Sequence, residues 1–277
     1  MKIAAVTGHP VKHSRSPLIH NHWLKTYGLE GTYEKRDVPP DEAAYFFKSL
    51  KENGLVGVNV TIPNKEKALE CAEVVDEAAK AIGAVNTLWL DPDGKLCGSN
   101  TDGIGFVSNL DQNAPGWDKN HQKAVVLGAG GASRAIVWAL LQRGFTEVHI
   151  LNRTLEKSQS LRDHFGSRVL VEHWDNRSKI LDNCNLLVNT TSLGMEGQNA
   201  LEINLQNLPT DAVVTDIVYT PLMTDLLVRA RERGNTVVDG LGMLLHQAVS
   251  GFEKWFGITP TVTDELRQII LKDMGRM

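Results

Sequence analysis

The sequence predicts an α/β protein with two domains, the second of them built on a doubly wound parallel sheet. Over the first hundred residues, strand-like and helix-like segments alternate. Between residues 123 and 219 the strand-like segments become near-continuous apolar runs, which are typical of parallel strands buried on both faces. A chain of 277 residues with 42% hydrophobic content is long enough for two cores.

Charge and cysteine content exclude several classes of partner. A formal net charge of −4 provides no basic field for nucleic acid or anionic lipid. Three widely spaced cysteines indicate reduced thiols. The N-terminal apolar run is too short for a signal peptide, and no stretch approaches the length of a membrane span. We therefore expect a cytoplasmic protein that binds neither nucleic acid nor membrane, and a homodimer stays open.

The first domain is expected to alternate strands and helices and to end in a hairpin. Ser16 is the expected N-cap of its first helix, with Pro17 at the first helical position and Gly28 just past the end. The turn at 91–94, Asp-Pro-Asp-Gly, predicts the hairpin. The expected strands are 2–8, 31–38, 56–63, 84–90 and 95–100, and the expected helices are 16–28, 41–54 and about 65–81.

The second domain is expected to span 103–240 and the first domain 1–102. A helix over 103–113 leads into successive apolar strands within 123–131, 147–154, 167–172, 185–192, 212–219 and 236–239. Two helices follow, one over about 243–256 and one capped by Thr261 with Asp264 three residues on. Because they come after the sheet is complete, we expect residues 241–277 to pack back on the first domain.

A glycine-rich turn joins the first strand of the second domain to a helix. Gly128-x-Gly130-Gly131 permits a tight turn whose backbone amides approach a pyrophosphate at the helix N-terminus. Ser133 stands where the third glycine of this fingerprint is usual, which weakens the match. A glycine turn needed only for packing is the alternative, but the strand–turn–helix–strand context favours a Rossmann-like dinucleotide site.

The end of the next strand predicts which dinucleotide binds. An NAD site usually carries a carboxylate there, which accepts hydrogen bonds from the ribose. This chain has Asn152-Arg153-Thr154 and no carboxylate before Glu156. An arginine and a hydroxyl suit a 2′-phosphate, so we expect NADP(H).

Polar side chains recur at the strand ends and helix starts of the first domain. Each has an ordinary structural explanation: Ser16 can serve as an N-cap only, and Lys65 can be a surface lysine. Together they form the inventory that a small polyhydroxylated acid requires. The set comprises Ser14, Ser16, Asn59, Thr61, Lys65, Asn86, Thr87, Asn100, Thr101 and Asp102. Four histidines, His9, His13, His20 and His22, have no recognised metal-ligand spacing, and we interpret them as ordinary polar residues.

Eight segments between about residues 7 and 260 resemble the shikimate dehydrogenase family in order and spacing. They are KHSRSP, NVTIPNK, GAVNT, NTDG, GAGGASR, NRT, DIVYTPLMT and DGLGMLLHQA. The resemblance implies reversible, NADPH-dependent reduction of 3-dehydroshikimate to shikimate in aromatic amino-acid biosynthesis. It also implies an N-terminal α/β substrate domain, a C-terminal Rossmann-like NADP domain and a cleft between them that holds the substrate.

The same resemblance assigns roles to individual residues and requires no metal. Lys65 and Asp102 would form the catalytic pair, with Lys65 as the acid and base. The substrate would contact Ser14 and Ser16 through its carboxylate, with Tyr219 nearby, and Asn59, Thr61, Asn86, Asp102 and Gln247 through its hydroxyls. The cofactor would contact Gly128, Ala129, Gly130, Gly131, Ala132, Asn152, Arg153, Thr154, Thr190, Ser192, Ile217, Gly240 and Met243.

Three other functions stay open, of which a folate-linked dehydrogenase of related two-domain plan is the weakest, because HSRSP has no clear role there. A quinate/shikimate dehydrogenase that also accepts NAD would be favoured by a carboxylate at position 152 or 153, and there is none. A shikimate-sensing module without catalysis would be favoured by loss of Lys65 or Asp102, and both are present.

Overall fold

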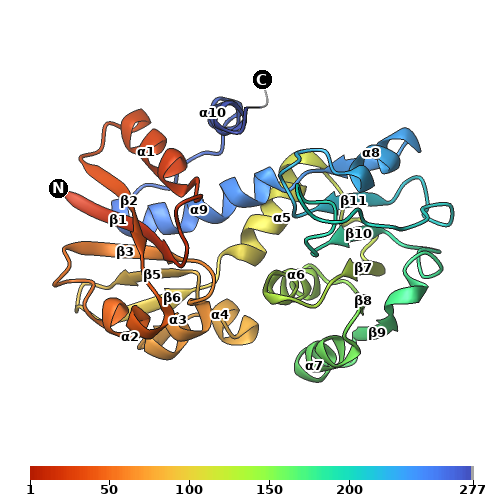
Figure 1. Ribbon diagram of the computed structural model, residues 1–277, viewed down its shortest axis with the longest axis horizontal. Helices are drawn as coiled ribbons and strands as arrows, with labels where there is room; N and C mark the ends of the chain where they lie inside the picture. Colours follow the sequence, from red (N-terminus) through yellow and green to blue (C-terminus); the bar gives the residue numbers. More distant parts are fainter. Residues whose placement is uncertain (276–277) are drawn as a thin grey trace. The chain divides into compact units, whose positions relative to one another are not determined.

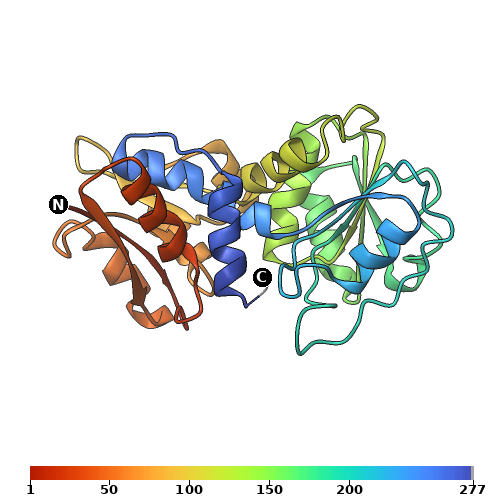
Figure 2. The same cartoon turned by 90° about the horizontal axis from the view of Figure 1, so that it is seen from above.

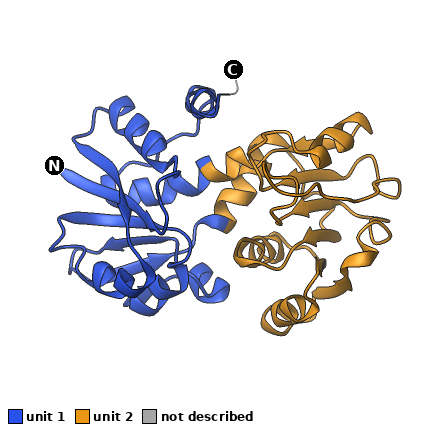
Figure 3. Cartoon of the chain, in the orientation of Figure 1, with its two compact units in different colours: residues 1–102, 245–277 blue, residues 103–244 orange. Residues whose placement is uncertain are grey.

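The computed structural model describes residues 1–275 and divides the chain into two compact units (Figures 1 and 3). Unit 1 comprises Met1–Asp102 and the chain from Leu245 onward, and unit 2 is Gly103–Leu244. The chain leaves unit 1 at the start of α5 (Asp102–Asn113) and returns to it within α9 (Leu241–Phe256). No helix in the described part of the chain is long and apolar enough to span a membrane.

Unit 1 contains a mixed six-stranded sheet in the order β2-β1-β3-β5-β6-β4. Strand β5 runs antiparallel to both β3 and β6, whereas the other pairs are parallel. The predicted hairpin at 91–94 is confirmed as the β5–β6 connection. The strands are β1 (Lys2–Gly8), β2 (Gly31–Asp37), β3 (Leu55–Val60), β4 (Val74–Val75), β5 (Thr87–Leu90) and β6 (Leu96–Ser99).

Helices cover both faces of this sheet. On one face, α2 (Pro40–Lys48), α3 (Lys65–Cys71) and α4 (Glu77–Ile82) contribute to a core that includes Val58 and Val60. On the other face lie α1 (Ser16–Thr26), α9 and α10 (Asp264–Asp273), with α10 beside α1 (Figure 1). A Cβ at Gly57 would lie 2.1 Å from the Trp255 indole nitrogen, so this glycine allows α9 to approach β3 closely.

The predicted long helix over about 65–81 is wrong. Helix α3 ends at Cys71, and Val74 and Val75 then pair with β6 as strand β4. Helix α4 begins after Asp76, whose carboxylate accepts a hydrogen bond from the Ala79 amide at 2.7 Å. Two β-branched residues followed by a capping aspartate favour this break over a continuous helix.

Helix ends also differ from the sequence-based expectations. Arg15 is the N-cap of α1, and Ser16 is the first helical residue. Thr263, not Thr261, caps α10, because its hydroxyl accepts a hydrogen bond from the Leu266 amide at 3.2 Å. Helix α2 ends at Lys48, well short of Gly54. Several serine or threonine candidates close to a helix start make the exact cap hard to choose from sequence.

Unit 2 contains a six-stranded sheet in which every pair is parallel, in the order β12-β11-β10-β7-β8-β9. This order confirms the predicted doubly wound, Rossmann-like sheet. The order in which the strands are added reverses between β7 and β10, which is the topological switch point. The strands are β7 (Lys123–Leu127), β8 (Glu147–Asn152), β9 (Val169–His173), β10 (Leu186–Asn189), β11 (Val213–Asp216) and β12 (Thr236–Val238).

Two hydrophobic cores sandwich this second sheet, and helices flank it on both sides (Figure 2). One core includes Phe106 of α5, Ile136 of α6 (Gly131–Gln142) and Leu161 of α7 (Leu155–Phe165). The other includes Leu226 of α8 (Asp225–Glu232) and the irregular segment 201–208. Burial on both faces explains why the strands read as continuous apolar runs.

Candidate active site

Lys65 and Asp102 meet in unit 1, although they lie 37 residues apart in the sequence. Lys65 is the first residue of α3 and Asp102 the first of α5. The Lys65 ammonium donates a hydrogen bond to Asp102 Oδ2, and their side chains are 28% and 15% exposed. The pair is therefore sheltered but still open to a small molecule.

Asn86 holds the other oxygen of the Asp102 carboxylate. Its Nδ2 donates to Asp102 Oδ1 at 2.8 Å, and its Oδ1 accepts from the Thr101 amide at 2.9 Å. The Val85 amide donates to the Lys65 carbonyl at 3.0 Å, which ties the start of α3 to the segment that carries Asn86. A half-buried carboxylate with both oxygens bonded has a fixed orientation.

Asn59 on β3 lies in a second, buried group of hydrogen bonds. Its Nδ2 donates to the Thr87 hydroxyl at 3.2 Å, and its Oδ1 accepts from the Tyr33 hydroxyl at 2.6 Å. Burial raises the pKa of Tyr33 well above its ordinary value, so the phenol stays a neutral donor. Tyr33 carries no functional signal in the sequence, because only the pairing of β1 with both β2 and β3 brings it near Asn59.

His20 lies fully buried behind Tyr33, so its interpretation as an ordinary polar residue is wrong. The two rings stack with centroids 4.0 Å apart and planes inclined by 10°. Neither ring nitrogen has a hydrogen-bond partner among the described residues. Burial lowers the pKa of His20 to about 3, an effect that nearby Asn59 opposes in part.

The remaining predicted substrate residues come from other segments of the chain. Ser14 and Ser16 lie at the start of α1, with their hydroxyls 3.2 Å apart. Thr61 follows β3, and its amide donates to the Thr7 carbonyl at 2.8 Å. Gln247 belongs to the part of α9 in unit 1, whereas Tyr219 belongs to unit 2, on the loop after β11.

A hollow of about 210 Å³ in unit 2 collects most of the predicted cofactor residues. It lies where β7, β8 and β10 end, at the carboxyl edge at which doubly wound sheets bind ligands. Lys157 and Trp174, which sequence analysis missed, line it as well. Its lining comprises Gly128, Ala129, Gly130, Asn152, Arg153, Lys157, Trp174, Thr190, Thr191, Ser192 and Leu193.

The glycine turn has the geometry of a phosphate cradle. Gly128 has φ +108°, and a Cβ there would lie 2.6 Å from the Thr190 hydroxyl. A Cβ at Gly130 or Gly131 would meet no atom within 4 Å, so the space beside these backbone amides is open. Ser133, the departure from the fingerprint, is buried and donates to the Gly130 carbonyl at 2.6 Å, so it supports the turn. The turn, with Arg153 and Lys157 beside it, fits the phosphates of a dinucleotide.

Other predicted cofactor residues lie next to the hollow or apart from it. Gly131 and Ala132 open α6, and Thr154 is the N-cap of α7. Ile217, Gly240 and Met243 do not line the hollow. A Cβ at Gly240 would lie 2.4 Å from the Ile217 carbonyl oxygen, so these two residues are close neighbours.

Asp216 joins the loops that follow β10 and β11. Its carboxylate accepts hydrogen bonds from Asn189 Nδ2 at 3.0 Å, from the Val218 amide at 2.9 Å and from the Thr224 hydroxyl at 2.8 Å. Asn189 in turn accepts from the Thr191 amide at 3.0 Å. Burial raises the pKa of Asp216 to about 6, against the effect of these hydrogen bonds. Through these hydrogen bonds, the Asp216 side chain links the loop after β10 to the loop after β11.

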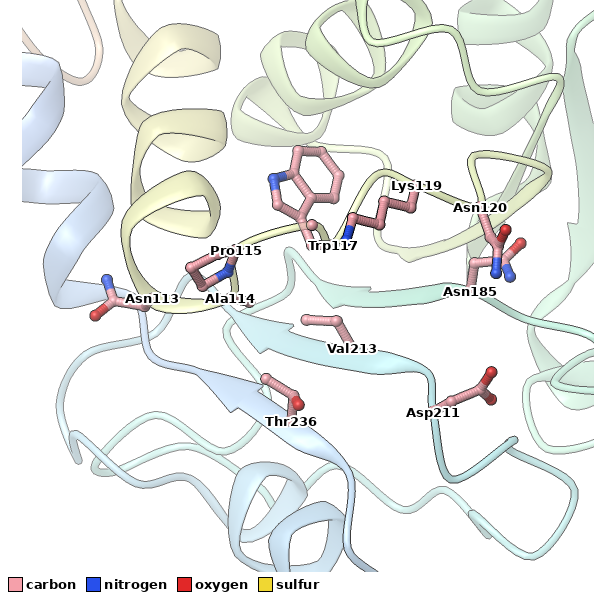
Figure 4. A pocket seen from close by; sticks show the side chains of 11 residues that line it. Asn113, Ala114, Pro115, Trp117, Lys119, Asn120, Asn185, Asp211, Val213 and Thr236 are labelled. Atoms are coloured by element: carbon pink, nitrogen blue, oxygen red, sulfur yellow. The ribbon is translucent and has the colours of Figure 1, made fainter.

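A larger hollow, of about 420 Å³, lies at the opposite edge of the same sheet (Figure 4). Asn185, Val213 and Thr236 mark the amino ends of β10, β11 and β12 there, and Trp117 and Lys119 line it from the connection after α5. Nucleotides bind doubly wound sheets at the carboxyl edge, so we do not assign the cofactor to this hollow. Within residues 1–275, no group of three His, Cys, Asp or Glu side chains is placed to hold a metal ion.

A doubly wound unit with a phosphate cradle, joined to a second α/β unit with a Lys–Asp pair, defines a nicotinamide-dependent dehydrogenase of two domains. Family models then identify the family. The shikimate dehydrogenase substrate binding domain matches residues 6–88, shikimate / quinate 5-dehydrogenase matches 111–218, and the shikimate 5′-dehydrogenase C-terminal domain matches 240–264. The chain belongs to the shikimate dehydrogenase family.

Individual relatives agree with this assignment. The shikimate dehydrogenase (NADP(+)) of Brucella abortus strain S19 is 55% identical over 276 residues, which cover 99% of this chain and 95% of the relative. Shikimate 5-dehydrogenase from Thermus thermophilus, solved with NADP(H) and shikimate, is 35% identical, with a TM-score of 0.85 and coverage of 98% and 99%. Quinate dehydrogenase from Corynebacterium glutamicum, solved with NAD, is 27% identical, with a TM-score of 0.89 and the same coverage.

Proposed function

We propose that this chain catalyses the reversible NADPH-dependent reduction of 3-dehydroshikimate to shikimate, a step of aromatic amino-acid biosynthesis. The observation that carries the proposal is the Lys65–Asp102 pair, held by Asn86 in a sheltered but accessible position. The Brucella abortus relative, which is named for this activity and for NADP(+), supports it over nearly the whole chain.

Lys65 is the acid and base of this reaction. NADPH, which the glycine turn and Arg153 of unit 2 would hold, would supply a hydride to the carbonyl carbon of 3-dehydroshikimate. The carbonyl oxygen then needs a proton, which Lys65 donates, and Lys65 takes the proton back in the reverse direction. General acid–base help of this kind is worth about 10²–10⁴-fold in rate. Asp102 accepts a hydrogen bond from the Lys65 ammonium and so orients it.

Unit 1 is the substrate domain in this account. Ser14 and Ser16, whose hydroxyls are adjacent at the start of α1, would receive the substrate carboxylate. The family resemblance adds Tyr219 to these contacts. The hydroxyls of the ring would bond to amide and hydroxyl side chains, namely Asn59, Thr61, Asn86 and Gln247, and to Asp102. The buried Tyr33–Asn59 hydrogen bond supports this role, because it holds Asn59 in one orientation.

Unit 2 is the NADP domain. Residues 128–132 would bind the diphosphate, and Asn152, Arg153 and Thr154 the adenosine end. Arg153 and Lys157 line one hollow and provide two cations for the 2′-phosphate that distinguishes NADP from NAD. Thr190, Ser192, Ile217, Gly240 and Met243 would contact the rest of the cofactor.

We also infer a cytoplasmic location. The three cysteines, Cys71, Cys97 and Cys184, are all free thiols, as a reducing compartment would maintain them. A homodimer stays a prediction, and the mass of the particle in solution would test it.

Initial rates of nicotinamide reduction by the purified chain test the proposed function. Shikimate and quinate should each be crossed with NADP and NAD. We expect rapid turnover with shikimate and NADP and much slower turnover with the other three pairs.

Other outcomes would favour the alternatives. Comparable rates with quinate or NAD would indicate the broader quinate/shikimate enzyme. Shikimate binding without turnover of any pair would indicate a sensing module and would overturn the catalytic proposal.

A further inference from the structure

Trp174 lines the nucleotide hollow, but the reaction described above gives it no role. It begins the short 3₁₀ helix η1 (Trp174–Asn176), which directly follows β9. The hollow's other lining residues are glycine, alanine, leucine, polar or basic, and Trp174 is the aromatic residue among those that the structure describes there. A half-buried indole beside a phosphate cradle suits a flat, apolar part of the ligand.

The order of the strands indicates which part of the ligand that is. Strands β7, β8 and β9 are adjacent and parallel, so the segments after them lie side by side at one edge. The glycine turn follows β7, Arg153 follows β8 and Trp174 follows β9. A dinucleotide with its pyrophosphate at the turn and its 2′-phosphate at Arg153 therefore has its adenine next in line, at β9.

The indole is held in place without any ligand. The Arg177 guanidinium carbon lies over the Trp174 ring, 5.3 Å from its centroid. Arg177 Nη1 donates to the Trp174 carbonyl at 3.2 Å, and Arg177 Nε donates to the Glu202 carbonyl. Trp174 also packs against the core that contains Leu187 and Val214. Arg177 does not itself line the hollow, whereas Trp174 does.

We propose that Trp174 is the stacking surface for the adenine ring of the cofactor. The proposal deepens the proposed function, on which it rests, by assigning the base end of NADP to the segment after β9. Because Arg177 fixes the indole beforehand, little side-chain freedom is lost when the base stacks. Adenine is common to NADP and NAD, so Trp174 should strengthen the binding of both, whereas Arg153 and Lys157 should distinguish them.

Calorimetric titration of the full chain with adenosine 2′,5′-bisphosphate, NADP⁺ and NAD⁺ tests this assignment. Trp174→Ala should weaken the binding of all three ligands by about ten-fold or more, as loss of an aromatic–base stack does. Trp174→Phe, which keeps an aromatic face, should retain most of the affinity. Trp89→Ala is the matched control, because Trp89 is half-buried under Lys254 in unit 1 and does not line the nucleotide hollow.

Fluorescence supplies a readout that loss of folding would not imitate. Adenosine 2′,5′-bisphosphate should quench part of the tryptophan emission of the parent, and this quenched part should be missing in Trp174→Phe. Unchanged affinity in Trp174→Ala, or the same quenching in Trp174→Phe, would overturn the adenine assignment while leaving the proposed function intact. Failure of the parent to bind any of the three ligands would overturn both.

Discussion

A single ion pair at the start of two helices carries the chemistry that we propose for this chain. Lys65 is held by Asp102, and Asp102 is held by Asn86, so a flexible side chain has one preferred position. A lysine in that position can exchange a proton repeatedly with one substrate oxygen. Lys67, whose side chain is exposed, pairs within residues 1–275 with Glu70 on its own helix and lacks such support.

His20 is a titratable residue that burial in unit 1 keeps uncharged. The ring is fully buried among Tyr33, Phe252 and two tryptophans, with no described hydrogen-bond partner for either nitrogen. Its pKa is lowered from 6.5 to about 3, so folding requires the neutral ring. The unfolded chain binds a proton at His20 near pH 6.5 and the folded chain does not. Folded-state stability therefore falls as the pH drops from 6.5 towards 3.

Replacing His20 by phenylalanine should reduce the sensitivity of the fold to acid. The aromatic stack is retained, but no group remains to be protonated in the unfolded chain. On going from pH 7.5 to pH 5, the free energy of unfolding of the variant should fall by about 2 kcal/mol less than that of the parent. Urea titrations at the two pH values measure this difference. The same substitution at His22, half-buried on the same helix, is the control, and an equal difference there would contradict the account of His20.

Not all of these residues could be found from the sequence. Lys65, Asp102 and Asn86 lie in segments whose family resemblance is strong, so their pairing could be expected. Tyr33 and His20 carry no such signal, because a tyrosine on a strand and a histidine on a helix are ordinary in sequence. Their roles arise from contacts between α1, β2, β3 and α9, and only the folded sheet makes these contacts evident.

At the scale of elements, the carboxyl ends of the parallel strands position most residues of the nucleotide hollow. The loops after β7, β8 and β10 line the nucleotide hollow, and Asp216 ties the loop after β11 to the one after β10. Helices α6 and α7 begin at this edge, so their amide-rich N-termini lie where phosphates bind.

The segment after β8 should decide between NADP and NAD. Arg153→Asp replaces a cation at the hollow by an anion that repels the 2′-phosphate. We expect the dissociation constant for NADP to rise at least about ten-fold more than that for NAD, because NAD lacks this phosphate. Arg162→Asp is the matched control, because Arg162 lies on α7, just after Arg153 in the chain, and pairs with Asp163 outside the hollow. An equal rise in the dissociation constants for NADP and NAD in Arg153→Asp would contradict the assignment of Arg153 to the 2′-phosphate.

Elements with one dominant signal could be predicted from sequence, and those with competing signals could not. The buried strands β7, β8, β10 and β11 were evident from their apolar runs, and the turn at 91–94 from its residue types. The interval 65–81 was misjudged because its alanine and glutamate content favours helix, while Val74 and Val75 favour a strand. Pairing with Cys97 and Gly98 of β6, a long-range effect, decides between these preferences.

At the scale of the whole molecule, the two units contain sheets of different topology and have different proposed functions. In the sheet of unit 1, β5 runs antiparallel to its neighbours, whereas all strands in the sheet of unit 2 are parallel. Strand–helix alternation predicted α/β structure in both but gave no sign of the strand order in unit 1. The proposed division, with substrate in unit 1 and cofactor in unit 2, follows from where the predicted residues lie.

The most direct test of the account is a comparison of Lys65→Ala with the parent chain in kcat and in the dissociation constant for shikimate. Lys67→Ala, two residues along the same helix, is the control. The account predicts that Lys65→Ala lowers kcat by about 10²–10⁴-fold, while shikimate binding changes by no more than a few-fold and Lys67→Ala resembles the parent. Near-normal turnover by Lys65→Ala would contradict the assignment of Lys65 as the acid and base.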